Sequence, residues 1–445
     1  MLLQPTEARY GEGIVLGQAL AVATGRPLYP PLGEPPYSVT AYPPLYYLAV
    51  ATLLPITGPS LVPGRLLSLA ALALAAALIA LAVTPLAGGR WGLLAAFLFL
   101  AQPAAAEWVG LHRVDSLALA FALAGLLLAS RSRLGLAALA ITLSVLTKQT
   151  YLAAPLAVPL WLVCNGRWRE AARFSVTVLG LVSSGVLLLQ HLSGGQFLRH
   201  IVDANLNPYF PTLVLAWLGW AAVVSGPLLL GAVLGLGVLP RRWLLWKLYL
   251  LASLPNILAL GKEGASFNYW FEPLAAAAVL TTGVLALLLV RRPRRAAAGA
   301  VAFLVTLLPA AAATVRASSA AVVQAGTDRP YVEQAIQFVR DAPGEVLSED
   351  LAIPVLAGKP VAFEYVIFTI LWVEGAWSAE PLIEDVAAGR YPYLLLLGDD
   401  DPLAGDCHCF PPPVWHALQQ HYQRENRLGR FVVYRFKERA ERAAR

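Results

Sequence analysis

Long apolar runs separated by short basic segments restrict the fold of this chain more than any other feature. A helix that crosses a bilayer needs roughly 17–25 mostly apolar residues. Ten runs approach this requirement, and we predict spans at about 66–86, 91–108, 115–130, 134–147, 150–165, 174–191, 211–238, 244–260, 270–290 and 296–314. Only 13% of the residues are charged, against about a quarter in soluble proteins. The sequence therefore predicts a polytopic α-helical membrane protein with about 10 spans.

The runs 134–147 and 150–165 are short and are separated by Thr147-Lys148-Gln149. They could form one long tilted helix or two helices in a hairpin. A lysine in the middle of a bilayer is energetically costly. The hairpin, with Lys148 at its tip, is therefore favoured.

The distribution of basic residues indicates which loops face the cytoplasm. Loops on one side contain twelve basic residues, namely Arg90, Arg131, Arg133, Arg167, Arg169, Arg173, Arg241, Arg242, Arg291, Arg292, Arg294 and Arg295. Loops on the other side contain five, namely Arg65, Arg113, Lys148, Arg199 and Lys262. Cytoplasmic loops carry the excess of Lys and Arg, so the richer side is predicted to be cytoplasmic. This clustering accounts for the net charge of +6 without a nucleic-acid partner.

The stretch AYPPLYYLAVATLLPITG, residues 41–58, is apolar but short, and it contains prolines near both ends. The charge alternation neither requires nor excludes a crossing here. Its length and prolines favour a juxtamembrane helix that lies on or dips into the outer face. We therefore divide the chain into a first extracytoplasmic loop (1–63), a transmembrane domain (64–315) and a soluble α/β domain (316–445).

The last of these segments has the composition of a soluble unit. A helix is predicted at 331–342, strands at 344–350 and 391–400, a second helix through 414–425 and a final strand at 431–436. An odd number of crossings separates this unit from the basic loop at 291–295, so it is expected outside the cell.

The predicted outer face collects ionisable and aromatic residues from distant segments. Ionisable groups at the edge of a membrane are often functional, although each also has a structural interpretation. Glu12 could be a solvated loop acid, Asp115 a helix N-cap, and Lys148 a snorkelling lysine. As a set, such groups suit group transfer. A carboxylate can act as general base, Lys or Arg can bind phosphate, and aromatic rings can hold a sugar or lipid chain.

The order of several motifs resembles a known family. An acidic YGEG segment is followed by YPPLYYL, GRLLSLAALALA, HRVDSLALAF, LTKQTYLAAPLA, DANLNPYF and GKEGASFNYWFEPLAAA. This order, over roughly residues 5–290, is similar to that of the membrane glycosyltransferases of the C fold. These include protein O-mannosyltransferases, the aminoarabinose transferases of lipid A and oligosaccharyltransferase catalytic subunits.

The resemblance implies an inverting glycosyltransferase that uses a polyprenyl-phosphate sugar on the extracytoplasmic side of the cell membrane. It implies juxtamembrane helices and an essential acid in the first outer loop, best matched by Glu12 and then Glu7, with Asp115 as the acid of the second outer loop. Lys148, Arg113 and Lys262 are the candidates for the donor phosphate. Candidate substrate contacts are Tyr42, His112, Tyr151, Asn207, Asn268, Tyr269 and Glu272.

The resemblance leaves open a divalent cation such as Mg²⁺ or Mn²⁺, and no organic cofactor is expected. The acceptor, whether lipid, glycan or protein, is not identified. Two departures stand out: the family usually has a span before the acidic loop, and its common acid is Asp rather than Glu. Two other functions remain open, a lipid or sugar transporter or flippase and a membrane scaffold with an outer binding domain.

Overall fold

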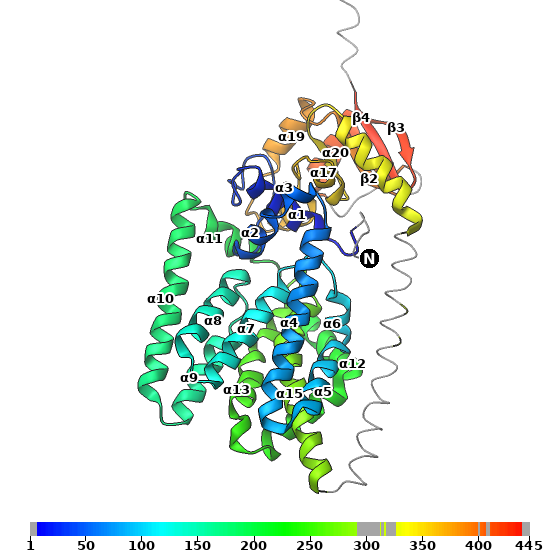
Figure 1. Ribbon diagram of the computed structural model, residues 1–445. Coiled ribbons are helices and arrows are strands. Elements are labelled where there is room, and N and C mark those ends of the chain that lie inside the picture. The colour runs from blue at the N-terminus through cyan, green and yellow to red at the C-terminus, as the bar shows by residue number, and fades with distance from the viewer. Residues whose placement is uncertain are drawn as a thin grey trace, which may run out of the picture.

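A computed structural model describes residues 7–291, 312, 316, 326–398, 401–405 and 410–437. It contains a bundle of apolar helices and, at one end of that bundle, a small sheet domain (Figure 1). Three short helices from the start of the chain, α1 (Glu12–Ala23), α2 (Leu45–Ala51) and α3 (Leu54–Thr57), lie between the two parts. We refer to the end of the bundle that meets the sheet domain as the near end.

The bundle is built from apolar helices that pack side by side. Its elements are α4 (Val62–Ala87), α5 (Gly89–Leu100), α6 (Pro103–Trp108), α7 (Asp115–Ser130), α8 (Leu134–Thr147), α9 (Ala153–Cys164), α10 (Trp168–Leu192), α11 (Gln196–Ile201), α12 (Pro211–Val238), α13 (Leu244–Ser253), α14 (Pro255–Leu258) and α15 (Phe271–Arg291). Short 3₁₀ turns, η1 (Asp203–Asn205), η2 (Arg241–Trp243), η3 (Ala259–Gly261) and η4 (Phe267–Trp270), lie between them.

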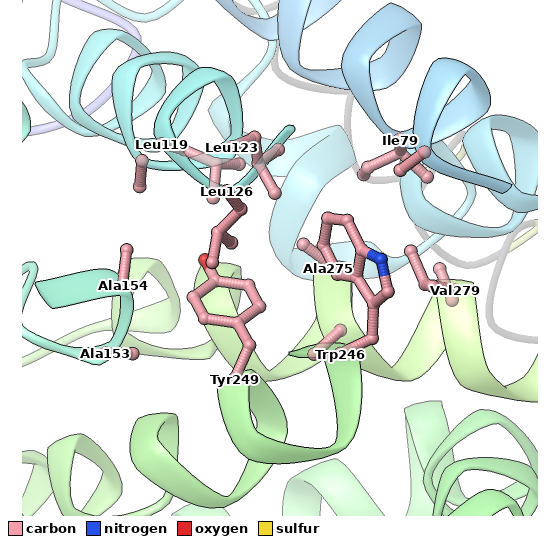
Figure 2. Packing of buried hydrophobic residues seen from close by; sticks show 14 of the residues in the cluster. Ile79, Leu119, Leu123, Leu126, Ala153, Ala154, Trp246, Tyr249, Ala275 and Val279 are labelled. Carbon is pink, nitrogen blue, oxygen red and sulfur yellow. The ribbon is translucent and has the colours of Figure 1, made fainter. Parts of the chain in front are cut away.

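Aromatic side chains of α13 fill the centre of the bundle. Trp246 points toward α4 and α15, and Tyr249 points toward α7 and α9 (Figure 2). The neighbouring helices contribute mostly alanine and leucine there, including Ala275 of α15 and Leu123 of α7. Small residues let helix backbones approach closely in a membrane, and the two large rings occupy the remaining space.

Five stretches of the described residues are long and apolar enough to cross a membrane. They are Val62–Ala87, Trp168–Leu192, Pro211–Val238, Arg241–Gly261 and Phe267–Val290. The helices α5, α7, α8 and α9 are also apolar but only 12–16 residues long. The count of ten spans therefore stays a prediction, and the tenth, 296–314, lies outside the described residues.

One predicted span is divided in the structure, and the predicted hairpin at 134–165 is present. The run 91–108 is divided into α5 and α6 because Gln102, which precedes Pro103, adopts an extended ψ of 136°. A residue before proline is disfavoured in the helical region. Residues 148–152 separate α8 from α9, so 134–165 forms two helices with Lys148 between them, as predicted.

The segment 43–58 forms only the short helices α2 and α3. At 1.5 Å per residue, the seven residues of α2 extend about 10 Å, far less than the roughly 30 Å of a hydrocarbon core. Both helices pack against α1 at the near end. This arrangement agrees with the prediction that the segment does not cross the bilayer. The depth at which the segment lies in a bilayer stays a prediction.

The sheet domain contains four strands in the order β1-β2-β4-β3. The strands are β1 (Val346–Ser348), β2 (Tyr393–Leu397), β3 (Tyr422–Leu428) and β4 (Phe431–Phe436); only β1 and β2 are parallel. Helices cover the sheet at 326–341, α17 (Ala352–Leu356), α18 (Tyr365–Val373), α19 (Glu380–Ala387) and α20 (Pro412–His421).

One helix predicted in this domain ends earlier in the structure than expected. The helix expected through 414–425 stops at His421, and β3 begins at Tyr422. Strand β3 pairs with β4 across the turn at Gly429, whose φ is +59°. The backbone hydrogen bonds of this hairpin and the burial of Tyr422 override the local helical pattern.

The sheet domain is fastened to the first loop rather than suspended from the bundle. The backbone N–H of Tyr37 donates to the carbonyl of Ala362 at 3.1 Å, and that of Val39 donates to Glu364 Oε2 at 2.9 Å. Helix α17 packs directly on α1. The contact is close enough that a Cβ on Gly13 would lie 2.4 Å from the backbone nitrogen of Ala352.

Gly92→Ala is expected to destabilise the bundle. A Cβ at Gly92 of α5 would lie 2.5 Å from the backbone oxygen of Ala80 in α4, and a backbone atom cannot move aside cheaply. Overpacking of this kind costs roughly 1–3 kcal/mol. The measurement is thermal unfolding in detergent, with Gly180→Ala as control, because Gly180 of α10 has nothing within 4 Å of the added carbon. Equal melting temperatures for the two variants would contradict this packing.

Candidate active site

Asp115, the first residue of α7, lies at the centre of a buried polar cluster. Its Oδ1 accepts hydrogen bonds from Lys148 Nζ at 2.5 Å and from Asn268 Nδ2 at 2.8 Å. Its Oδ2 accepts one from Trp108 Nε1 at 3.1 Å. These partners come from the α8–α9 connection, from η4 and from α6. The fold thus brings three segments far apart in the chain to one carboxylate.

Aromatic rings enclose the cation of this pair. The Lys148 side chain is 2% exposed, and its Nζ lies 5.4 Å from the ring centre of Tyr42 and 5.0 Å from that of Tyr269. Tyr151 donates to the backbone oxygen of Asp115 at 3.0 Å. Six predicted site residues therefore meet here: Asp115, Lys148, Tyr42, Tyr151, Asn268 and Tyr269.

Lys262 adds a second cation near Lys148. Its Nζ donates to Asn205 Oδ1 at 3.5 Å, and its side chain is half-buried. Burial and the positive charge of Lys148 lower the pKa of Lys262 to about 8. The two lysines repel one another, and among the described residues Asp115 is ion-paired only with Lys148. An anion that binds both lysines would relieve this repulsion.

Glu12, at the start of α1, forms a second buried ion pair beside this cluster. Arg65 of α4 donates from Nε to Oε1 at 2.9 Å and from Nη2 to Oε2 at 2.8 Å, and both side chains are 0% exposed. The backbone N–H groups of Ala8 and His112 donate at 2.8 Å. Burial opposes ionisation, but the hydrogen bonds and charge of Arg65 hold the pKa of Glu12 below its ordinary value.

The HRVDS motif joins the two clusters. The backbone N–H of His112 binds Glu12, and three residues later Asp115 binds Lys148. Three residues extend at most about 11 Å, so the acids of the YGEG and HRVDS motifs lie at the same end of the bundle. Both ion pairs are therefore parts of one site.

His112 and Arg113 are turned away from Lys148. The ring of His112 is buried against Gly64 of α4, and a Cβ added at Gly64 would lie 2.1 Å from that ring. Burial lowers the pKa of His112 to about 3. The guanidinium of Arg113 lies over Gly11 and donates to the backbone oxygen of Tyr10. Gly11 has a φ of +91°, a conformation in which a side chain is strained.

Within the described residues, Glu7 accepts fewer hydrogen bonds than Glu12. Its Oε1 accepts a hydrogen bond from the backbone N–H of Gly13, and the side chain is half-buried. Burial and the negative charge of Asp350 raise the pKa of Glu7 well above its ordinary value, and Glu12 adds to this rise while Gly13 and Arg113 oppose it. Asp350 precedes α17, so the sheet domain tunes this carboxyl.

The last two predicted substrate contacts are placed differently. Glu272 is buried in the first turn of α15, close to Tyr249 and close enough to Lys148 for their charges to interact. Asn207 donates to the backbone oxygen of Glu263 at 3.0 Å in an exposed loop. It stabilises the connection between α11 and α12 rather than meeting Lys148.

An apolar groove of about 740 Å³ begins beside this site. Its walls come from the end of α1, the loop at 25–31, α2, and the last turn of α10, where Leu189 and Leu192 lie. Pro44 lines the groove, and two residues earlier the ring of Tyr42 covers Lys148. Only 11% of the apolar window of α10 is buried, so the groove borders a lipid-facing helix.

No group of three or more His, Cys, Asp or Glu side chains is placed to hold a metal within the described residues. Glu12 and Asp115 are each already compensated by a cationic side chain. The residues present do not form a cation cage, and the expected Mg²⁺ or Mn²⁺ stays a prediction.

The sequence analysis assigned no role in the site to three residues that organise it. Arg65, in the GRLLSLAALALA motif, holds Glu12, and Trp108 donates to Asp115. Arg9 pairs with Glu107 and lies 5.8 Å from the ring of Phe267. The one available signal was an arginine opening an apolar run, since buried charges are almost always paired. Nothing in the sequence marks Trp108.

Residues 40–265 match the sequence model of Glycosyltransferase family 87. The chain belongs to this family. The match covers half of the chain and includes Asp115, Lys148 and Lys262, whereas Glu12 lies before it and Asn268 just after it. The protein is therefore a membrane glycosyltransferase, and the enzyme interpretation holds over the transporter and the scaffold. Among curated proteins no match was found.

Solved structures show that the fold of this glycosyltransferase is shared. The crystal structure of ArnT from Cupriavidus metallidurans bound to undecaprenyl phosphate has a TM-score of 0.64 at 15% identity, over 97% of this chain and 95% of that one. Its apo form has a TM-score of 0.66 at 14% identity, over 97% and 94%. The apo oligosaccharyltransferase from Archaeoglobus fulgidus has a TM-score of 0.52 at 14% identity, over 88% and 66%. The predicted resemblance to C-fold glycosyltransferases is confirmed.

Arg65→Met is expected to destabilise the enzyme strongly. It leaves the carboxylate of Glu12 buried without its cation, and breaking a buried pair costs about 3–5 kcal/mol. Thermal unfolding in detergent measures this loss. The matched control is Arg329→Met, which breaks a half-exposed pair with Glu333 and should cost no more than about 1 kcal/mol. A melting temperature equal to that of the control would show that the Glu12–Arg65 pair does not hold this end together.

Proposed function

We propose that this glycosyltransferase transfers a sugar from a polyprenyl-phosphate donor to an acceptor on the extracytoplasmic side, with inversion at the anomeric carbon. The observation that carries the proposal is the placement of a buried Lys148–Asp115 pair, with Lys262 nearby, beside an apolar groove that borders a lipid-facing helix. Cations next to an apolar groove suit a ligand with a phosphate and a long hydrocarbon chain.

Lys148 and Lys262 bind the donor phosphate in this proposal. Before the donor arrives, Asp115 neutralises Lys148 and keeps its ammonium between the rings of Tyr42 and Tyr269. The phosphate then competes with Asp115 for the same ammonium. The cation offsets the charge that develops on the phosphate as the bond to the sugar breaks. Arg113 is not assigned to the phosphate, because it is directed toward Tyr10.

The groove beside Pro44 takes the first isoprene units of the donor. Its apolar wall includes Leu48, Leu189 and Leu192, which match a hydrocarbon chain. The ArnT neighbour with the same fold was crystallised with undecaprenyl phosphate, which supports this choice of donor. The sugar then lies near Asn268, whose Oδ1 is buried without a partner within the described residues and is available to a sugar hydroxyl.

Glu7 is the general base in this proposal. Within the described residues, the four hydrogen bonds to Glu12 come from Arg65 and backbone amides, so its carboxylate positions the HRVDS loop. Glu7 is half-buried and has a raised pKa, which suits proton abstraction near neutral pH. It takes the proton of the acceptor hydroxyl as that oxygen bonds to the anomeric carbon. The carbon–oxygen bond to the phosphate breaks, and polyprenyl phosphate leaves.

The acceptor would approach between the bundle and the sheet domain, because Glu7 lies there beside Asp350. The basic loops at the other end of the bundle support an extracytoplasmic position for the site. The acceptor itself is not assigned to a lipid, glycan or protein.

The proposal is tested with the purified protein in lipid nanodiscs. A panel of polyprenyl-phosphate sugars is supplied with lipid, glycan and peptide acceptors, and mass spectrometry follows release of polyprenyl phosphate. One donor should be consumed, and Lys148→Met should slow its consumption roughly 100-fold, as loss of a charge-stabilising donor does. The control is Lys437→Met, which removes an exposed lysine of the sheet domain.

The same assay separates the roles of the two acids. Glu7→Gln should lower turnover by roughly 100-fold or more while the donor still binds, whereas Glu12→Gln should also lower the melting temperature. Use of a soluble nucleotide sugar in place of any lipid-linked donor would overturn the proposal. Full turnover in Glu7→Gln would remove Glu7 from the role of base.

The pH profile of kcat/KM should be bell-shaped. Below the raised pKa of Glu7 the base is protonated, so activity falls on the acid side. Above pH about 8 Lys262 loses its proton and its attraction for phosphate, so activity falls on the alkaline side. Asp350→Asn removes a charge that raises the pKa of Glu7, so the acid limb should move to lower pH.

Lys262→Gln should remove the alkaline limb and weaken donor binding below pH about 8, where the lysine of the wild type is charged. Glu374→Gln, which removes an exposed acid after α18, is the control for Asp350→Asn and should leave both limbs in place. An acid limb that is unchanged in Asp350→Asn would contradict the assignment of that limb to Glu7.

A further inference from the structure

A second polar cavity lies at the opposite end of the bundle from Asp115. It has a volume of about 350 Å³ and is formed where α4 ends, α5 begins, α12 ends and α15 ends. Pro85, which lines it, is 20 residues along α4 from Arg65. At 1.5 Å per residue, the two are about 30 Å apart, the thickness of a hydrocarbon core. The glycosyltransferase site and this cavity therefore lie at the two faces of the bilayer.

Two arginines from distant parts of the chain meet at this cavity. Arg90 follows the turn between α4 and α5, and Arg242 follows the end of α12. Both are exposed, and neither forms an ion pair within the described residues. The guanidinium carbon of Arg90 lies 5.7 Å from the centre of the Trp91 ring. The site has positive charge and no assigned counter-ion.

The remaining walls are apolar. Leu86, Leu239, Leu287 and Val290 line the cavity together with Trp91 and Trp243. Tryptophan is enriched where protein meets the headgroup layer. Free phosphate would gain nothing from this apolar surface, whereas a phospholipid places its phosphate at the rim and its chains along the helices. The guanidinium fork matches phosphate geometry.

We propose that this cavity binds the phosphate headgroup of an anionic membrane phospholipid in the leaflet opposite the glycosyltransferase site. Arg90 and Arg242 hold the phosphate, and the ends of α12 and α15 contact the acyl chains. The site connects the ends of four helices, so occupancy stabilises the bundle by linkage. The proposal rests on this cavity and not on the proposed donor or acceptor.

The test compares the full chain in nanodiscs of phosphatidylcholine alone and of phosphatidylcholine with phosphatidylglycerol. Phosphatidylglycerol should raise the melting temperature of the wild type, and native mass spectrometry should detect retained lipid. Arg90→Gln with Arg242→Gln should weaken retention roughly thirtyfold, from the contribution of two cations at an anionic surface. Both side chains are exposed, so the variant should fold.

The matched control is Arg131→Gln with Arg133→Gln, which removes two exposed arginines of the α7–α8 turn that do not line the cavity. This double variant should keep both the rise in melting temperature caused by phosphatidylglycerol and the bound lipid. Equal losses in both double variants would indicate general attraction to a negative surface and overturn the site. If inorganic phosphate in phosphatidylcholine nanodiscs raised the melting temperature as much as phosphatidylglycerol does, the lipid assignment would also be overturned.

Discussion

The buried pair between Glu12 and Arg65 is the contact on which the near end of the molecule depends. It joins α1 to α4 through two hydrogen bonds, and the same carboxylate holds the backbone of His112. Two charges buried without water are costly unless every lone pair is used, and here two backbone amides complete the set. The pair therefore fixes where the HRVDS loop runs and, three residues later, where Asp115 points.

The neighbouring pair has a different electrostatic character. Asp115 neutralises Lys148, but Lys262 remains nearby with a pKa lowered by burial and by that same lysine. Two neighbouring cations, one of them enclosed by tyrosine rings, suit the binding of an anion. The sheet domain acts in the opposite direction at Glu7, because burial raises the pKa of that acid and the negative charge of Asp350 raises it further. One end of the bundle thus holds both an anion-binding part and a proton-accepting part.

Much of this organisation could be predicted because it depends on local patterns. Apolar runs predicted the helices, the basic loops predicted which ends lie together, and the order of motifs predicted the family. The misplaced boundaries have local tertiary causes: Pro103 divides the run 91–108, and pairing with β4 converts 422–425 to strand. Which of the two acids, Glu7 or Glu12, is the better candidate for the general base could not be predicted, because the role of a carboxylate depends on its partners. Within the described residues Glu12 accepts four hydrogen bonds, whereas Glu7 accepts one.

The sequence by itself determined that this chain enters a membrane, that its polar residues gather at span ends, and that Asp115 and Lys148 share a face. These properties follow from hydrophobicity and periodicity, which neighbouring residues specify. Only the tertiary structure decided that Lys148 pairs with Asp115, that Arg65 holds Glu12, and that the sheet domain acts on Glu7. Such pairings join residues 33, 53 and more than 300 positions apart, and no short-range pattern encodes which of several buried charges will meet.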